Sequence, residues 1–422
     1  PPSQAAVAFL LALLPIMLLP SALATGEITP SNLRTVGLLP FLYVVPALGL
    51  WTLLRLVRSL AGLDGKWLGV LFLGASVAVV GLLGTRTARA YNTWSSSPAL
   101  YYAADGDLAD AARYLNGASL SSTTPYVASL HYRHPTLAFL AESYERVRWL
   151  VDGRTLVFPP EGQALILYPR SASEHLPWVQ SILPPRALTA SSPGPDGETA
   201  FRVFRVDAAD APTPSVRRDA RFGRAAQLLG YTVTREPRSG ERVDVAVMWR
   251  VVGQPDQPDY RAVARLVDAW GSLWADAQPL HYPSEQWTEG ELIVDHLSIP
   301  VPPAAPPGSY TIQFGFYAPG SDAQLPLLDP SGAYAGSHAE LSVEVRPAAV
   351  SPSPDELGIE RRLDVSLDGL TLLGTNLTST KLRPGERLQA ALIWQAGREP
   401  RSSRELSLRL GGITLYRGAP VH

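Results

Sequence analysis

Long apolar runs dominate the first 84 residues, and a mixed pattern of apolar and polar positions follows them. Three stretches are long and apolar enough for membrane-spanning helices, which need about 20 residues each: Ala5–Ala24, Gly37–Leu54 and Trp67–Gly84. Only six charged residues lie in this region, whereas 18% of the whole chain is charged. The pattern predicts a membrane α-helical segment of three spans over residues 1–86.

The first apolar stretch has a second interpretation. Ala22-Leu23-Ala24 matches the small-residue pattern of a cleavage site, so residues 5–24 also fit a secretory signal. No basic residue precedes the apolar run and two further stretches follow it, which favours a membrane span. Because the first residue is Pro1 and not Met, we expect the chain to begin inside a longer protein.

The basic residues of the loops predict an orientation. Arg55, Arg58 and Lys66 lie between the second and third stretches, whereas Arg34 is the only basic residue between the first and second. Cytoplasmic loops are enriched in Lys and Arg, so we expect residues 55–66 to lie inside the cell. The chain is then a multi-pass protein of the cell membrane, with everything after Gly84 outside the cytoplasm.

Residues 87–210 alternate between helical and strand-like patterns. Leu108, Ala111, Ala112 and Leu115 have the spacing of one helix face, and Asp105-Gly106-Asp107 before them predicts a cap. Short apolar runs predict strands at Pro125–Leu130, Val147–Val151, Thr155–Phe158, Ala164–Tyr168 and Phe201–Val206, with further helices at Thr136–Ser143 and Ser173–Leu183. Neither common glycine-rich phosphate motif occurs, so we expect a small extracytoplasmic α/β domain without a phosphate-binding loop.

Residues 211–347 change to a purely β pattern. Val243, Val245 and Val247 alternate with polar or small residues, as in a strand with one buried face. Many short strands separated by turns rich in Pro and Gly predict a β-sandwich of immunoglobulin-like size. The chain has no Cys, which excludes disulfides, thiolate metal ligands and cysteine catalysis.

An internal repeat extends the β prediction to the C-terminus. Its first copy holds Leu228-Leu229-Gly230, then Gly240-Glu241-Arg242 and Trp249; its second holds Leu372-Leu373-Gly374, then Gly385-Glu386-Arg387 and Trp394. The two copies keep nearly constant spacing. Residues 348–422 are therefore predicted to form a partial second β-sandwich repeat, truncated at the end of the chain.

The charge balance and the missing motifs limit the functions that the sequence predicts. The 36 basic and 38 acidic residues nearly balance, which argues against a nucleic-acid partner, because such proteins carry a basic surplus. No G-x-S-x-G or H-E-x-x-H motif occurs. We therefore predict no catalytic residue, no metal site and no cofactor in this chain.

Several polar and aromatic residues have both a functional and a structural interpretation. His131 and His134 have the spacing to share a metal ion, but Pro135 follows them and no third ligand has a recognisable spacing. Asp105, Asp107 and Asp110 could hold a cation, although capping of a helix explains them better. Trp249 and Trp394 are either core residues or sugar-binding platforms, and Asn376-Leu377-Thr378 is a sequon.

Arg34 is the one residue for which we predict substrate binding. It immediately precedes the second apolar stretch, at the depth where a lipid phosphate would lie. A guanidinium pairs bidentately with phosphate oxygens, and a nearby low dielectric strengthens the pair. Equally, an interfacial arginine extends its charged head to lipid headgroups without any specific ligand.

Several segments resemble polytopic GT-C glycosyltransferases of the protein-mannosyltransferase-like family 39 from Chloroflexi-like bacteria. The resembling segments are Pro30–Arg34 with Gly37 and Pro40, Tyr91–Leu115, Tyr126–Ser129 with His134–Thr136 and Phe139-Leu140, Gln286–Pro300 and Pro306–Tyr310. The first is similar to the last outer loop of that family, and Tyr91–Leu115 is similar to the segment after its final membrane helix. The family's catalytic acidic residue belongs to the first outer loop, which this chain does not contain.

The resemblance implies the C-terminal portion of an integral-membrane glycosyltransferase. Its donor would be a polyprenyl-phosphate sugar, bound through Arg34, and its acceptor a cell-envelope glycan or protein outside the cytoplasm. The alternative is a non-enzymatic, membrane-anchored surface protein whose β-sandwiches bind glycan or protein partners.

Overall fold

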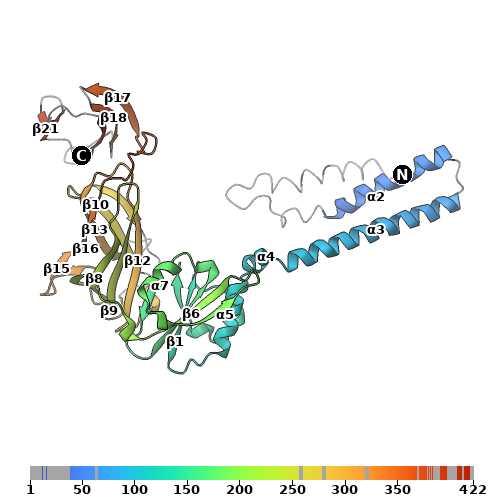
Figure 1. Cartoon of the computed structure of the whole chain (residues 1–422), viewed down its shortest axis with the longest axis horizontal. Coiled ribbons are helices and arrows are strands. Elements are labelled where there is room, and N and C mark those ends of the chain that lie inside the picture. The colour runs from blue at the N-terminus through green and yellow to red at the C-terminus, as the bar shows by residue number, and fades with distance from the viewer. Residues whose placement is uncertain are drawn as a thin grey trace. The chain divides into compact units, whose positions relative to one another are not determined.

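Figure 1 shows the computed structural model of the chain, which forms two compact units, Pro1–Ser96 and Ser97–His422. The structure describes residues 12, 16, 39–61, 65–255, 260–277, 282–318, 323–367, 370–377, 379, 381, 383, 390–396, 406–410 and 413–418. Within these residues, most of the second unit is β-sheet, in several sheets with few helices.

Apart from positions 12, 16 and 96, the described part of the first unit consists of two helices, α2 (Leu39–Ala61) and α3 (Gly65–Ser95). Among the described residues, one segment, Gly69–Ser95, is long and apolar enough to cross a membrane, with a mean hydropathy of 1.7 and none of it buried. Apolar side chains exposed all around a helix are typical of a helix in lipid. The predicted second stretch is helical as α2, whereas the first lies outside the described residues except for positions 12 and 16.

The second unit opens with an α/β region. Its helices are α4 (Pro98–Ala103), α5 (Gly106–Gly117), α6 (Pro135–Leu140) and α7 (Leu176–Ile182). Its sheet has the order β2-β1-β4-β6-β5, from β1 (Thr123–Ser129), β2 (Arg148–Val151), β4 (Gln163–Pro169), β5 (Leu188–Pro193) and β6 (Thr199–Val206). Strands β2 and β4 pair parallel to β1, and the rest pair antiparallel. The apolar face predicted for α5 is buried, which confirms that helix.

Strand β3 (Thr155–Phe158) follows β2 but joins a different sheet. Asp152 and Gly153 both have positive φ, 64° and 65°, in the tight turn that reverses the chain. Every residue of β3 is buried, and the strand pairs antiparallel with β12 (Leu292–Pro300), with Thr155 opposite Asp295. The α/β region therefore contributes one strand, β3, to a sheet of the following β region.

That sheet and a second one pack face to face. The seven-stranded sheet has the order β15-β14-β7-β8-β9-β12-β3 and the four-stranded sheet the order β11-β10-β13-β16. Their further strands are β7 (Val216–Phe222), β8 (Ala226–Arg235), β9 (Arg242–Val251), β10 (Arg261–Asp268), β11 (Leu273–Ala277), β13 (Gly308–Tyr317), β14 (Leu327–Leu328), β15 (Tyr334–Gly336) and β16 (Ala339–Val345). Phe316 of β13 contacts Phe222 and Trp249 of the facing sheet, with ring centroids 5.2 and 5.1 Å apart.

The C-terminal strands repeat one detail of this arrangement. They form a sheet of β17 (Arg361–Leu367), β18 (Leu370–Leu377) and β19 (Ala390–Ala396), and a hairpin of β20 (Leu406–Leu410) and β21 (Ile413–Gly418). Leu372 lies opposite Trp394 with a bulge before Gly374, just as Leu228 lies opposite Trp249 with a bulge before Gly230. The second Gly-Glu-Arg copy, residues 385–387, lies outside the described residues.

Candidate functional site

A polar groove crosses the outer face of the four-stranded sheet. Strand register places Asp276 of β11, Arg265 of β10, Gln313 of β13 and Glu340 of β16 in one row across the strands. Residues two positions further along point to the same face, because side chains alternate along a strand. The next row holds Val263 opposite Gly315, and Tyr317 lies beyond them. Val263 and Gly315 have short side chains or none, whereas the rows on either side carry long ones. The groove is the depression above this short row.

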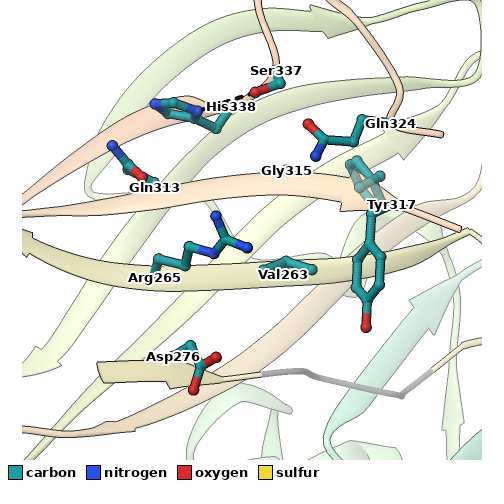
Figure 2. A pocket seen from close by; sticks show the side chains of 10 residues that line it. Val263, Arg265, Asp276, Gln313, Gly315, Tyr317, Gln324, Ser337 and His338 are labelled. Carbon is teal, nitrogen blue, oxygen red and sulfur yellow. Dashed lines mark hydrogen bonds between the residues drawn. The ribbon is translucent and has the colours of Figure 1, made fainter. Parts of the chain in front are cut away.

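Gly315 forms the floor of the groove because nothing larger fits there. A Cβ on this residue would lie 2.6 Å from the carbonyl oxygen of Ser337, which precedes β16. Figure 2 shows Val263 and Gly315 with the side chains of Arg265, Asp276, Gln313, Tyr317, Gln324, Ser337 and His338 around them. The cavity has a volume of about 140 Å³ and opens to solvent.

The polar groups of the groove are mostly unpartnered. Among the described residues, neither Arg265 nor Asp276 forms an ion pair, and His338 contacts only the Ser337 hydroxyl, at 3.4 Å. The groove therefore presents guanidinium and amide N–H donors beside carboxylate and amide acceptors. These groups can bind a ligand through hydrogen bonds. The contact between the Ser337 hydroxyl and the His338 ring, at 3.4 Å, is longer than the ~2.6–3.2 Å typical of a nucleophile and its base.

Buried carboxylates lie elsewhere, where the α/β region meets the β region. Glu291 pairs with Arg148, accepts hydrogen bonds from the hydroxyls of Tyr126 (3.0 Å) and Tyr282 (3.2 Å), and accepts another from the Thr288 amide (3.0 Å). Burial raises the pKa of Glu291 above its ordinary value despite these partners. Such a network fixes the two regions to each other, and a structural role accounts for every contact.

Asp295 is the second buried carboxylate and contacts neutral donors. The Thr155 hydroxyl donates to one oxygen at 2.6 Å, and the indole N–H of Trp249 donates to the other at 2.7 Å. Burial raises the pKa of Asp295 to about 6. The residue lies in the sheet between β9 and β3, away from solvent, so it has no access to a substrate.

Two histidines meet at the same junction. His296 stacks on Trp178, with ring centroids 4.8 Å apart and an interplanar angle of 8°, and its Nε2 lies 3.5 Å from a carboxylate oxygen of Asp244. His175 accepts a hydrogen bond from Arg154 at 2.9 Å, and burial lowers its pKa. No group of three or more His, Cys, Asp or Glu that could hold a metal ion occurs in the described part of the chain.

The predicted binding residue, Arg34, lies outside the described residues. His131 and His134 are neighbours, with ring centroids 6.0 Å apart, but His134 is occupied in the turn before α6, where its Nδ1 accepts from the Thr136 amide. Asn376 of the sequon binds the backbone of Gly358 and Glu360 through its amide group.

The predicted side-chain cap of α5 is confirmed in part, because the Asp107 carboxylate accepts from the first-turn amide of Leu108 at 2.9 Å. Asp105 occupies the N-cap position with a left-handed φ of 56°, and its side chain makes no capping hydrogen bond. It accepts from the Thr136 hydroxyl at 2.8 Å. Asp107 is buried and accepts from the Ser171 amide at 2.8 Å, and Asp110 binds Tyr101 at 2.6 Å. The three carboxylates therefore bind separate partners.

Trp249 is 2% exposed, so its prediction as a core residue is confirmed and the platform interpretation is wrong for it. Trp394 is half-buried. Sequence reasoning missed the groove because its members are spread over residues 263–338 without a motif. The one available signal was the outward position of Arg265 and Gln313 in alternating strands.

Comparison with known proteins identifies no family. No protein-family model matches the chain, and no curated protein matches it in sequence. Solved structures are similar to small parts of it. The C-terminal domain of wzt is 12% identical with a TM-score of 0.24, over 32% of this chain and 83% of that one. An FMN-binding beta-glucuronidase from Faecalibacterium prausnitzii L2-6 is 15% identical with a TM-score of 0.18, over 35% of this chain and 18% of that one. A beta-glucosidase from Listeria innocua in complex with glucose is 13% identical with a TM-score of 0.17, over 28% of this chain and 16% of that one. Likenesses of this size assign no function.

Proposed function

We propose that this chain is the C-terminal part of an integral-membrane glycosyltransferase. It would act with a polyprenyl-phosphate sugar as donor and an acceptor outside the cytoplasm. In this proposal three spans precede the α/β region, and the β regions are immunoglobulin-like sandwiches. The α/β region and the β regions all follow the last span and lie outside the cytoplasm.

One observation carries the proposal. The segment Tyr91–Leu115, which resembles the region after the last membrane helix of family 39 enzymes, begins in the apolar helix α3 and runs through α4 into α5. A membrane helix followed within two residues by a folded unit is the organisation that this resemblance requires.

Arg34 would serve the donor in this proposal. As the sugar leaves polyprenyl phosphate, negative charge develops on the phosphate oxygens, and a preorganised guanidinium stabilises that charge. The acceptor hydroxyl would lose its proton to an acidic residue acting as general base, supplied by a loop outside this chain. The chain itself would bind and position substrates.

The gene that encodes this chain tests the proposal. Several further apolar spans upstream, with an acidic residue in the first outer loop, are expected. A start codon immediately before Pro1 would contradict the enzyme and leave the surface protein as the explanation.

A membrane-anchored surface protein without enzyme activity is the second candidate. It is favoured by the chemistry of the described residues, where the groove offers hydrogen-bonding groups suited to binding a ligand. Both candidates place the second unit outside the cytoplasm, and they differ in whether sugar is transferred.

A further inference from the structure

We infer that the groove lined by Arg265, Asp276, Gln313, Tyr317 and Gln324 binds one residue of a neutral, hydroxyl-rich glycan chain. The inference concerns binding alone and is independent of whether the chain belongs to an enzyme.

Size is the first argument. Pockets that enclose a whole small ligand or cofactor hold about 300–1,000 Å³. The groove holds about 140 Å³ and is open on the outer face of the sheet. It therefore suits a single ring of a polymer whose neighbouring units continue over the surface.

The hydrogen-bonding groups give the second argument. Arg265 supplies only donors, Asp276 only acceptors, and the amides of Gln313 and Gln324 supply both. These planar groups are mixed within one small space (Figure 2). A ligand must then offer donors and acceptors close together, and neighbouring hydroxyls do so because each hydroxyl is both.

Charge excludes an anionic ligand as the preferred occupant. Arg265 and Asp276 are direct cross-strand neighbours of opposite charge. Glu340 continues the same row on β16. A phosphate or sulfate would meet these carboxylates as well as the guanidinium, and like charges repel.

Tyr317 supplies an apolar contact at one end of the groove. Its ring is half-buried and belongs to β13, the strand that also carries Gln313 and Gly315. An aromatic side chain combines an apolar ring with a polar tip, so it can pack against the C–H groups of a sugar while its hydroxyl remains hydrated.

Strand pairing argues against an extended peptide. Peptides that add to a sheet use the free backbone groups of an edge strand. The groove lies over β10 and β13, which are both central strands with partners on each side. Over these two strands only side chains are available to a ligand, which favours a saccharide; of the lining residues, Asp276 comes from the edge strand β11.

Affinity electrophoresis of the full chain in detergent, through native gels containing soluble polysaccharide, tests the inference. The probes are dextran, yeast mannan and galactan, with dextran sulfate as the charged counterpart of dextran and denatured casein as the peptide probe.

We expect at least one neutral polymer to slow the wild-type chain. Gln313→Ala and Arg265→Ala should each weaken this retardation about tenfold, since each removes hydrogen bonds from a bound ligand. Val263→Trp should abolish it by filling the groove.

The matched control is Arg250→Ala, which removes an exposed arginine from β9 in the other sheet and should leave retardation unchanged. A thermal unfolding transition shows that each variant is folded. If Val263→Trp does not fold, the retardation of Gln313→Ala tests the inference. Retardation by none of the neutral polymers overturns the inference. So does retardation by dextran sulfate or casein alone, or equal retardation of wild type and Gln313→Ala.

Discussion

Asp295 allows a sharp test of how the two regions of the second unit are joined. This carboxylate is 2% exposed and is held by Thr155 of β3 and Trp249 of β9. Asparagine has nearly the same shape, and its amide fits both partners. Its oxygen can accept from the Trp249 indole, and its N–H can donate to the Thr155 hydroxyl, which also accepts. We therefore expect Asp295→Asn to fold with both partners kept, although the second amide N–H and the Thr155 O–H then each need another acceptor.

The magnitude follows from the raised pKa. Burial raises the pKa of Asp295 from 3.8 to about 6, so the folded protein holds this proton more tightly than the unfolded chain. A raised carboxyl pKa contributes stability below the unfolded value of 3.8, and that contribution is lost as pH rises through about 6. At about 1.4 kcal/mol for each pKa unit, the loss is ~3 kcal/mol. Asp295→Asn should be more stable than wild type by up to that amount at pH 7, and about equal to it near pH 4.

Urea denaturation measures this difference on a fragment that starts at Ser97. Unfolding is monitored by tryptophan fluorescence at several pH values between 4 and 7. The difference between wild type and variant cancels the contributions of all other titrating groups. Asp244→Asn is the matched control, because the His296 hydrogen bond lowers the pKa of Asp244. Its carboxylate contributes stability above its unfolded pKa, so this variant should lose stability at pH 7. A difference for Asp295→Asn that does not vary with pH, or a loss of stability at pH 7, would refute the reasoning.

Three further predictions concern packing and topology. Trp249→Ala should cost ~3–5 kcal/mol in the same denaturation assay, because it removes a large buried ring; a loss below about 1 kcal/mol would show that the ring contributes little to the core. A fragment of residues 216–346 lacks β3 and leaves the edge of β12 exposed, so we expect it to self-associate in sedimentation experiments while residues 97–346 stay monomeric; equal behaviour would show that β3 is dispensable. A reporter fused after Ser96, beyond the end of α3, should be active only outside the cytoplasm, and one placed at Ser59 only inside; the opposite pattern would reverse the proposed orientation.

Local patterns in the sequence predicted the elements whose environment has one buried face. The helix over α5 is an example, because its burial repeats with the helical period. The predicted valines of β9 are buried too, but that strand is buried on both faces from Val245 to Trp249. Strand β5 was missed because its Thr, Ser and Ala side chains are largely exposed and carry no apolar alternation. Strand β3 was predicted, but not its sheet, since a run that is buried on both faces does not indicate its partner.

The groove and the buried acids depend on contacts between distant segments. Arg265 and Gln313 are neighbours only through strand pairing, which no spacing in the sequence reveals. Asp295 did leave a signal, because it breaks an apolar alternation of Ile293, Leu297 and Ile299 in β12. A charged residue at such an inward position predicts a buried polar contact, but the partners, Thr155 and Trp249, follow only from the fold.

Sugar transfer by the full-length gene product tests the proposed function most directly. Membranes that contain it are supplied with a radiolabelled polyprenyl-phosphate sugar, and incorporation into envelope material is measured for wild type, Arg34→Ala and Arg34→Lys. The account predicts transfer by wild type and a fall of ~10²–10³ in rate for Arg34→Ala, as for the loss of one preorganised donor. Arg34→Lys should recover part of the rate, since an ammonium cannot make the bidentate contact. No transfer by wild type, or the wild-type rate in Arg34→Ala with both proteins inserted at equal levels, would contradict it.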